Sequence, residues 1–296
     1  MIATHAHWPW TNNGGDVGVT AFFVLSGFLI TTILVGQQER HGRIDAIAFY
    51  RRRIIRLAPA LLGLLGFTVV FGIAIGPHSQ WQVGLASCLA YVSNWAQVAG
   101  INIDPLGHTW SLAIEEQFYL VWPAILIFAR GRVLPVAIGG LIVGSVVRVI
   151  TTGDFEYFST VTRADAILVG CILAIVKPRW PAGVGLAGLI GLVVVSLLDP
   201  VHDIAIPAAM IATAAVIAGP FEPLGVLAPM GLRAYSLYLW NWPMTLLFGT
   251  VGAIAPLLTF VSAEISYRLL EKPVLHRGDR RVTSTRRLAD PVQPVT

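Results

Sequence analysis

Ten apolar runs divide the chain, and most of them are long enough to form a membrane-spanning helix. A bilayer's hydrocarbon core is about 30 Å thick, so a helix needs roughly 20 apolar residues to cross it. Glycine, proline and charged residues separate the runs. The runs fall at about 17–36, 54–76, 83–98, 111–129, 133–150, 163–177, 184–198, 204–220, 233–249 and 252–270. This pattern predicts an all-α fold, a polytopic transmembrane helical bundle of about ten helices.

One run differs from the others. The run at 83–98 is short, contains the polar residues Ser93 and Asn94, and is flanked by Trp81 and Trp95. Backbone that does not span the bilayer is tolerated at membrane depth where protein surrounds it. We therefore expect this run to be a short re-entrant segment.

The topology follows from a basic stretch, FYRRRIIRLAP at 49–59, which precedes the second long run. Lysine and arginine concentrate in cytoplasmic loops, so this stretch is predicted to be a cytoplasmic loop. With 83–98 re-entrant, only Arg148 and Arg163 of the 20 lysine and arginine residues fall outside. Counting 83–98 as a full span reverses every later loop, so the charge distribution favours the re-entrant interpretation.

Composition supports the membrane class and limits the partners. The 296 residues are 55% hydrophobic and only 12% charged, whereas a soluble domain is about 25% charged. The net charge of +4 resides at the ends of spans, so the lipid bilayer is an expected partner and nucleic acid is not. Cys88 and Cys171 lie in apolar runs and are interpreted as small core residues.

Two units are predicted along the chain. Residues 1–273 form a transmembrane domain, and the polar residues 274–296 form a cytoplasmic, disordered tail. The chain begins as if partway through a span, which suggests a truncated first helix.

Ionisable residues inside apolar runs are the candidates for chemistry, since each costs at least ~2.5 kcal/mol near the bilayer centre. They are His5, His7, Asp16, His108, Glu115, Glu116, Arg148, Arg163, Asp165 and Glu264. In the topology above most of them lie at outward-facing helix ends. His5, Asp16, Glu115, Glu116, Arg163 and Asp165 are placed where they can share one outward-opening cavity. The arginine stretch at 49–59, a candidate anion site, lies on the opposite face. A protein with these two sites is suited to passing a chemical group from one side of the membrane to the other.

Two of these positions suggest acid–base chemistry. His5 is an imidazole near a span end, able to act as base or nucleophile, or else simply interfacial. Asp16 can orient a histidine. Glu115 and Glu116 cannot share a helical face, so one is expected to face the bundle interior while the other favours the helix dipole.

Charged pairs suggest binding. Arg163 and Asp165 form either a local charge pair or part of a substrate site. Arg53 and Arg56 lie at i, i+3, a spacing that can clamp one phosphate group, although topology signalling alone also explains them.

Six sequence blocks resemble one family in order. GGDVGVTAFFVLSGFLIT, FYRRRIIRLAPAL, HTWSLAIEEQFYLVWP, TRADAILVGCILA, YSLYLWNWP and EISYRLLEKPVL together are similar to the membrane acyltransferase-3 family, the integral-membrane O-acyltransferases of bacterial glycans. The resemblance covers nearly the whole chain.

The resemblance implies an enzyme that moves an acyl group, in most cases acetyl, from cytoplasmic acyl-CoA to a glycan hydroxyl. It implies acyl-CoA as a co-substrate and no permanently bound cofactor; no metal site is expected. The acceptor is a glycan, lipopolysaccharide or glycolipid, and the location is the bacterial inner membrane.

The family's motifs map onto residues of this chain. Its catalytic histidine corresponds to His5 within Thr4-His5-Ala6, with His7 in reserve, and its glutamate to Glu116; Asp16 completes the expected catalytic group. Acyl-CoA binding is expected at Arg51, Arg52, Arg53 and Arg56. Substrate binding is expected at Glu115, His108, Arg163, Asp165 and Asn241.

Two departures from the family pattern stand out. An arginine usual some ten residues before the histidine is not in this chain, and Asn241 replaces a histidine in the YLWHWP block. An amide can hydrogen-bond but cannot titrate.

Two other functions fit the same features. One is a non-catalytic exporter of glycans or lipid intermediates that uses the polar cavity without making bonds. The other is an inactive, truncated paralogue.

Overall fold

The computed structural model describes residues 14–75, 81–129, 131–198, 201–219, 228–249 and 254–274. His5, His7 and the tail from 275 onwards lie outside the described residues. The main helices are α2 (Gly14–His41), α3 (Ala46–Ile75), α4 (Trp81–Leu89), α5 (Ser93–Val98), α6 (Trp110–Phe128), α7 (Val133–Ile150), α8 (Gly153–Phe158), α9 (Thr160–Val176), α10 (Ala182–Leu198), α11 (His202–Ala218), α12 (Ala228–Gly231), α13 (Ala234–Phe248) and α14 (Ile254–Ser266).

The predicted all-α polytopic bundle is confirmed. Five helical stretches are long and apolar enough to cross a membrane: Gly15–His41, Ala46–Ile73, Gly107–Phe128, Val133–Ile150 and Gly153–Val176. α10 and α11 are shorter apolar helices. Every long run expected from the sequence corresponds to a helix in the described part of the chain.

The arginine block lies in a helix, not in the loop that the sequence suggested. α3 begins at Ala46, so the four arginines occupy its first three turns. Asp45 starts the helix, because its Oδ1 accepts a hydrogen bond of 2.9 Å from the Ala48 N–H. No glycine or proline follows until Pro59, and arginine is a good helix former.

The run expected to be re-entrant is broken into α4 and α5, neither of which is long enough to span a bilayer. Tyr91, with φ of 53°, turns the chain between them. Asn94 then ties α5 to its neighbours: its Nδ2 donates to Thr160 Oγ1 at 3.0 Å, and its Oδ1 accepts from Gln117 Nε2 at 2.9 Å. Of the polar residues that set this run apart, Asn94 therefore holds it against the first half of α6 and the start of α9.

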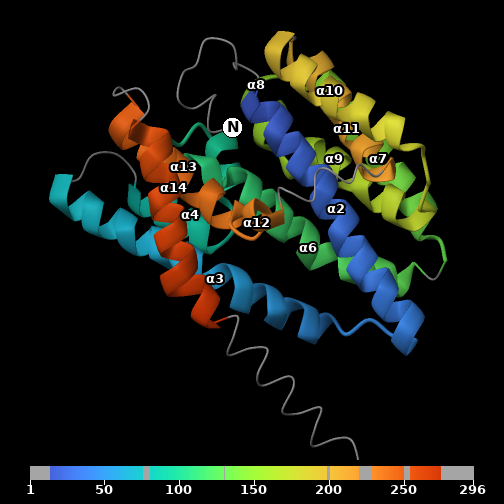
Figure 1. Cartoon of the computed structure of the whole chain (residues 1–296), viewed down its shortest axis with the longest axis horizontal. Coiled ribbons are helices and arrows are strands. Elements are labelled where there is room, and N and C mark those ends of the chain that lie inside the picture. Colours follow the sequence, from blue (N-terminus) through green and yellow to red (C-terminus); the bar gives the residue numbers. More distant parts are fainter. Residues whose placement is uncertain are drawn as a thin grey trace, which may run out of the picture.

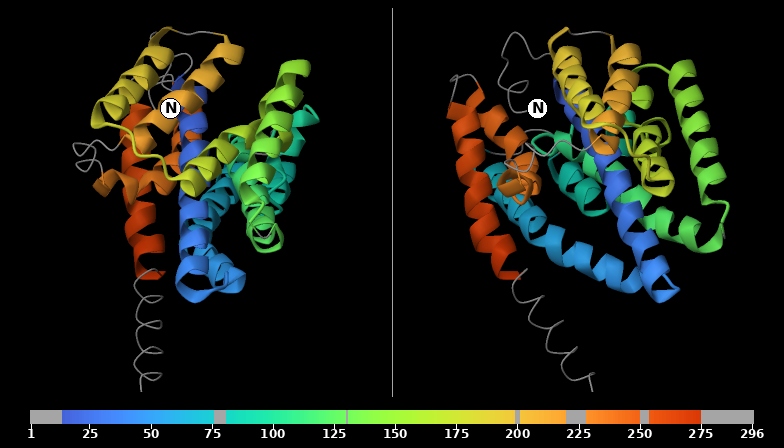
Figure 2. Two further views of the ribbon diagram at one scale, coloured as in Figure 1. Left: turned by 90° about the vertical axis from the view of Figure 1, so that its right-hand side faces the viewer. Right: turned by 45° about the vertical axis from the view of Figure 1, so that its right-hand side comes forward.

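α6 lies between two groups of helices, with α2 and α9 on one side and α3 and α13 on the other (Figure 1). An apolar cluster lies on each side. The larger cluster joins α6 to α2 and α9, with Phe23, Trp122 and Ile167 at its centre. The smaller cluster joins α6 to α3 and α13, through Leu64, Leu112 and Leu239. Figure 2 shows the result, with α14 and α7 on opposite sides of the molecule.

Helix ends meet in the order that an alternating topology requires. The C-terminal ends of α2 and α9 are joined by an ion pair of 3.0 Å between Glu39 and Lys177. The end of α6 and the start of α7 lie beside the same end of α2, where Leu126, Val133 and Gly42 line one cavity. The helix ends whose basic residues predicted a cytoplasmic location thus lie together on one face of the bundle, called the basic face. The cytoplasmic location of this face stays a prediction.

Glycines set the contact between α2 and α9. A methyl group at Gly27 would lie 1.9 Å from the Ile167 carbonyl oxygen, and one at Gly170 would lie 1.9 Å from the Val24 carbonyl oxygen. Small residues allow helix backbones in membranes to approach this closely. Both glycines belong to sequence blocks of the resemblance, so part of what those blocks encode is packing.

Alanine at either glycine is expected to disrupt this contact. Gly27→Ala and Gly170→Ala force two backbones apart, so each should destabilise the protein by about 3 kcal/mol or prevent its folding. Gly139→Ala is the matched control, because nothing lies within 4 Å of its added methyl group. Thermal unfolding in detergent measures the effect. A Gly170→Ala variant with the same unfolding midpoint as the wild-type protein would contradict the close contact.

Candidate functional site

An ion pair lies at the centre of the bundle. Arg53 of α3 reaches Glu116 of α6 with an N–O distance of 2.5 Å. The guanidinium carbon also lies 3.8 Å from the centroid of the Tyr119 ring. The side chains are 24% and 18% exposed, so the pair is largely removed from solvent. A charged pair in these surroundings fixes the position of α3 against α6.

The two adjacent glutamates of α6 face different helices, as their spacing requires. Glu116 faces α3, whereas Glu115 is buried and hydrogen-bonds to Ser26 of α2. The Tyr119 hydroxyl, one turn along α6, donates to Glu115 Oε1 at 3.3 Å. Tyr119 thus interacts with both glutamates, with Glu115 through its hydroxyl and with Glu116 through Arg53, which lies over its ring. The sequence signal for Tyr119 is the FY in the block EEQFY.

A second polar group lies where α2, α6 and α9 begin. Tyr157 of α8 donates a hydrogen bond to Asp16 Oδ1. Arg163, in the first turn of α9, lies 5.4 Å from the Tyr157 ring and 5.5 Å from the Trp110 ring. These aromatic partners of the predicted residues were not anticipated from the sequence.

Asp165 has a partner other than Arg163. Its Oδ2 forms an ion pair of 3.1 Å with Arg148 of α7, and both side chains are buried. The local pair considered for Arg163 and Asp165 is therefore not the arrangement in the structure. The acidic and basic residues expected to share one cavity divide into two groups, one around Arg53 and one around Arg163.

His108 and Asn241 lie at the contact between α13 and the start of α6, and both are buried. The His108 ring lies 5.4 Å from that of Tyr238, whose hydroxyl donates to the His108 carbonyl oxygen. The Tyr238 hydroxyl also lies 2.7 Å from Ser111 Oγ. Their predicted role in substrate binding stays a prediction.

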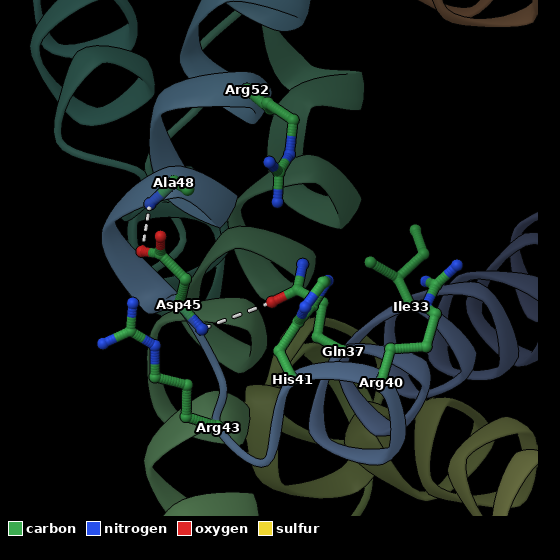
Figure 3. Close-up of a pocket in the computed structure, with 8 residues that line it drawn as sticks. All are labelled: Ile33, Gln37, Arg40, His41, Arg43, Asp45, Ala48 and Arg52. Carbon is green, nitrogen blue, oxygen red and sulfur yellow. Dashed lines mark hydrogen bonds between the residues drawn. The ribbon is translucent and has the colours of Figure 1, made fainter. Parts of the chain in front are cut away.

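A basic cavity opens at the turn between α2 and α3. Its volume is about 680 Å³, and its lining residues are Ile33, Gln37, Arg40, His41, Arg43, Asp45, Ala48 and Arg52. Figure 3 shows Arg52 extending from α3 towards Gln37 and His41, with Arg40 and Arg43 to either side. Gln37 Oε1 accepts a hydrogen bond of 3.3 Å from the Asp45 N–H, which ties the turn to α2.

This cavity contains one of the four arginines expected to bind acyl-CoA. Arg52 lines it, whereas Arg53 pairs with Glu116 and Arg56 acts electrostatically on Glu271. Arg51 is exposed. Arg53 and Arg56 thus have different partners, and their clamp on one phosphate stays a prediction. In the sequence, Arg40 and Arg43 serve only as topology signals and His41 does not stand out, although their position between the same two runs marks all three as neighbours of Arg52.

The central ion pair is expected to behave as a coupled unit. Arg53→Gln or Glu116→Gln leaves one charge unpaired among apolar neighbours, so each should destabilise the protein more than the double substitution does. The coupling free energy from the double-mutant cycle should be about 1–3 kcal/mol. Unfolding of all four proteins in detergent measures it. Additive effects of the two substitutions would contradict the pairing.

Comparison with known proteins assigns the family. Residues 1–265 match a family model described as an acyltransferase domain. O-acetyltransferase OatA of Staphylococcus aureus is 32% identical over 338 aligned positions, which cover 94% of this chain and 55% of that protein. Peptidoglycan O-acetyltransferase OatA of Listeria monocytogenes is 31% identical, with 94% and 54% covered, and putative peptidoglycan O-acetyltransferase YrhL of Bacillus subtilis is 32% identical, with 95% and 53% covered. The chain spans about half the length of these curated relatives, and no solved structure matches it. Since the family model covers most of the sequence, the chain belongs to the acyltransferase-3 family.

Proposed function

We propose that this protein is a membrane O-acetyltransferase of the bacterial plasma membrane. It takes an acetyl group from acetyl-CoA on the basic face and delivers it to a hydroxyl group of a cell-wall glycan on the other face. The names of the relatives, O-acetyltransferase and peptidoglycan O-acetyltransferase, support the acetyl group and the glycan. The structure supports the proposal by the position and charge of its basic cavity.

The basic cavity is the observation that carries the proposal. The nucleotide end of CoA bears several phosphate oxygens, and arginine binds phosphate with charge-assisted, forked hydrogen bonds. Arg40, Arg43 and Arg52 line a volume of about 680 Å³ together with His41. Asp45, the acidic residue in the lining, is already engaged by the backbone N–H of Ala48. The cavity is therefore suited to the phosphates of an acyl-CoA donor.

The chemical step is assigned to the other end of α2. A hydroxyl group is a poor nucleophile until a base removes its proton, and an imidazole is the side chain that does this near neutral pH. The block Thr4-His5-Ala6 supports His5 in this role, as base or as acyl carrier. Asp16 is buried in the first turn of α2, and this supports a role for its carboxylate in setting the protonation state of His5.

Glu116 has a supporting part in this proposal. Its ion pair with Arg53 joins the arginine block to the glutamate block, two of the motifs shared with the family. Glu116 therefore holds α3, which carries Arg52 into the cavity, at a fixed position against α6. The ion pair therefore fixes the position of the donor cavity relative to the central polar residues of α6.

Removal of cavity arginines is expected to weaken donor binding. Arg43→Gln and Arg52→Gln each remove a charge-assisted hydrogen bond to phosphate, so each should raise the Kd for acetyl-CoA about tenfold or more. Arg179→Gln removes an exposed arginine outside the cavity and should leave the Kd unchanged. Titration calorimetry on the detergent-solubilised protein measures the affinities. Equal affinities for the cavity variants and the control would move the donor site elsewhere.

Replacement of His5 tests the reaction itself. His5→Ala should lower acetyl transfer by about 10²–10⁴-fold and leave CoA binding intact, whereas His7→Ala should retain most of the activity. The measurement follows labelled acetyl groups from acetyl-CoA to glycan in membranes that contain the protein.

Three outcomes would change the assignment. An inactive His7 variant beside an active His5 variant would place the histidine chemistry two residues later. Full transfer by both variants would exclude histidine catalysis. Export of glycan without acetyl transfer would favour the exporter instead.

A further inference from the structure

The guanidinium of Arg163 is buried without a hydrogen-bond partner. The residue lies in the first turn of α9 and is 1% exposed. Its Nε, Nη1 and Nη2 atoms all lack a hydrogen-bond partner within the part of the chain that the structure describes. Buried charges are normally paired and hydrogen-bonded, since a charge removed from water is costly. An arginine with three unsatisfied nitrogens is therefore a departure that needs a physical explanation.

The surroundings of Arg163 are aromatic. Its guanidinium carbon lies 5.9 Å from the Phe23 ring, 5.5 Å from the Trp110 ring and 5.4 Å from the Tyr157 ring. Such rings stabilise a cation through their negative faces. They offer few acceptors for its N–H groups, because phenylalanine has none and an indole N–H only donates. The Tyr157 hydroxyl, which donates to Asp16, accepts no hydrogen bond from Arg163. The rings thus retain the charge and leave its hydrogen-bonding capacity unused.

The nearest carboxylates are directed to other groups. Asp165 forms its ion pair with Arg148, and its Oδ1 accepts from the Ala166 N–H at 2.6 Å. Asp16 accepts from Tyr157. Neither forms an ion pair with Arg163 within the described residues. Arg163 acts on Asp165 electrostatically without a direct ion pair. Its three nitrogens therefore remain open to the acceptor oxygens of a bound molecule.

We propose that Arg163 and its three aromatic neighbours form a binding site for an oxyanionic group, a carboxylate or a phosphate, on the acceptor. Two oxygens of such a group match the forked N–H donors of a guanidinium. The inference deepens the proposed function and rests on it for the word acceptor: it makes the acceptor an acidic glycan or a glycan carried on a phosphate.

The position of the site separates it from the donor cavity. Phe23 contacts Arg163, and His41 lines the basic cavity, both on α2. Eighteen residues of helix between them correspond to about 27 Å. An anion at Arg163 is thus distinct from the phosphates of a nucleotide held at the other end of α2.

Simple anions test the site without any acyl donor. The full chain in an uncharged detergent is melted in acetate, in inorganic phosphate and in chloride, all at one ionic strength. A saturating ligand that binds only the folded state should raise the wild-type midpoint by about 5 °C. We expect Arg163→Gln to lose this rise in acetate and part of it in phosphate, which the basic cavity is also expected to bind. Arg179→Gln, which removes an exposed charge, should keep the full rise.

The arms of the experiment distinguish the sources of the anion. The informative rise is the part that Arg163→Gln loses. If that part appears with acetate alone, it indicates a carboxylate on the acceptor, and if it appears with phosphate alone, it indicates a phosphate; both support an oxyanion site. Arg163→Lys keeps the charge but loses the fork, so half-maximal stabilisation should need about ten times more anion. Absence of any rise in wild type, an equal rise in Arg163→Gln, or an unchanged response in Arg163→Lys would overturn the proposal. Acetyl transfer is measured separately, so failure of this site leaves the proposed function standing.

Discussion

Pairing of charges within an apolar bundle is the constraint on which the rest of this structure depends. A charge away from water needs a partner, and here the partner comes from another helix. Arg53 and Glu116 join α3 to α6, and Arg148 and Asp165 join α7 to α9. These contacts specify which helices meet and at what height, which apolar side chains alone do not do in a solvent as apolar as themselves.

Glycine contacts complete this framework on the other side of α6. Gly27 and Gly170 bring α2 and α9 together so closely that neither position has room for a methyl group. Seven residues, about two helical turns, separate Gly170 from Arg163 on α9. The close approach therefore also places Arg163 beside Phe23 of α2. The glycine contact between α2 and α9 thus determines both the packing of these helices and the position of Arg163.

Along α6 the polar features follow a definite order. Arg163 lies against Trp110 at the start of the helix, and Arg53 lies against Glu116 six residues later, a rise of about 9 Å. The basic cavity lies beyond, where α2 ends and α3 begins. In the proposed function these three positions receive the acceptor, hold the framework and bind the donor, so acceptor and donor lie on opposite sides of the central ion pair.

The sequence by itself determined the class of the fold, the helical runs and the family, because hydrophobic length and ordered motifs are local properties of the chain. Ser93 and Asn94 likewise marked the run that does not span, since polar residues are costly against lipid. The tertiary structure alone decided the partners: that Asp165 pairs with Arg148 instead of Arg163, that Arg53 turns to Glu116 while Arg52 faces the cavity, and that Arg163 lies among aromatic rings. Adjacent residues on a helix point about 100° apart, so which neighbour each one meets depends on how distant helices pack.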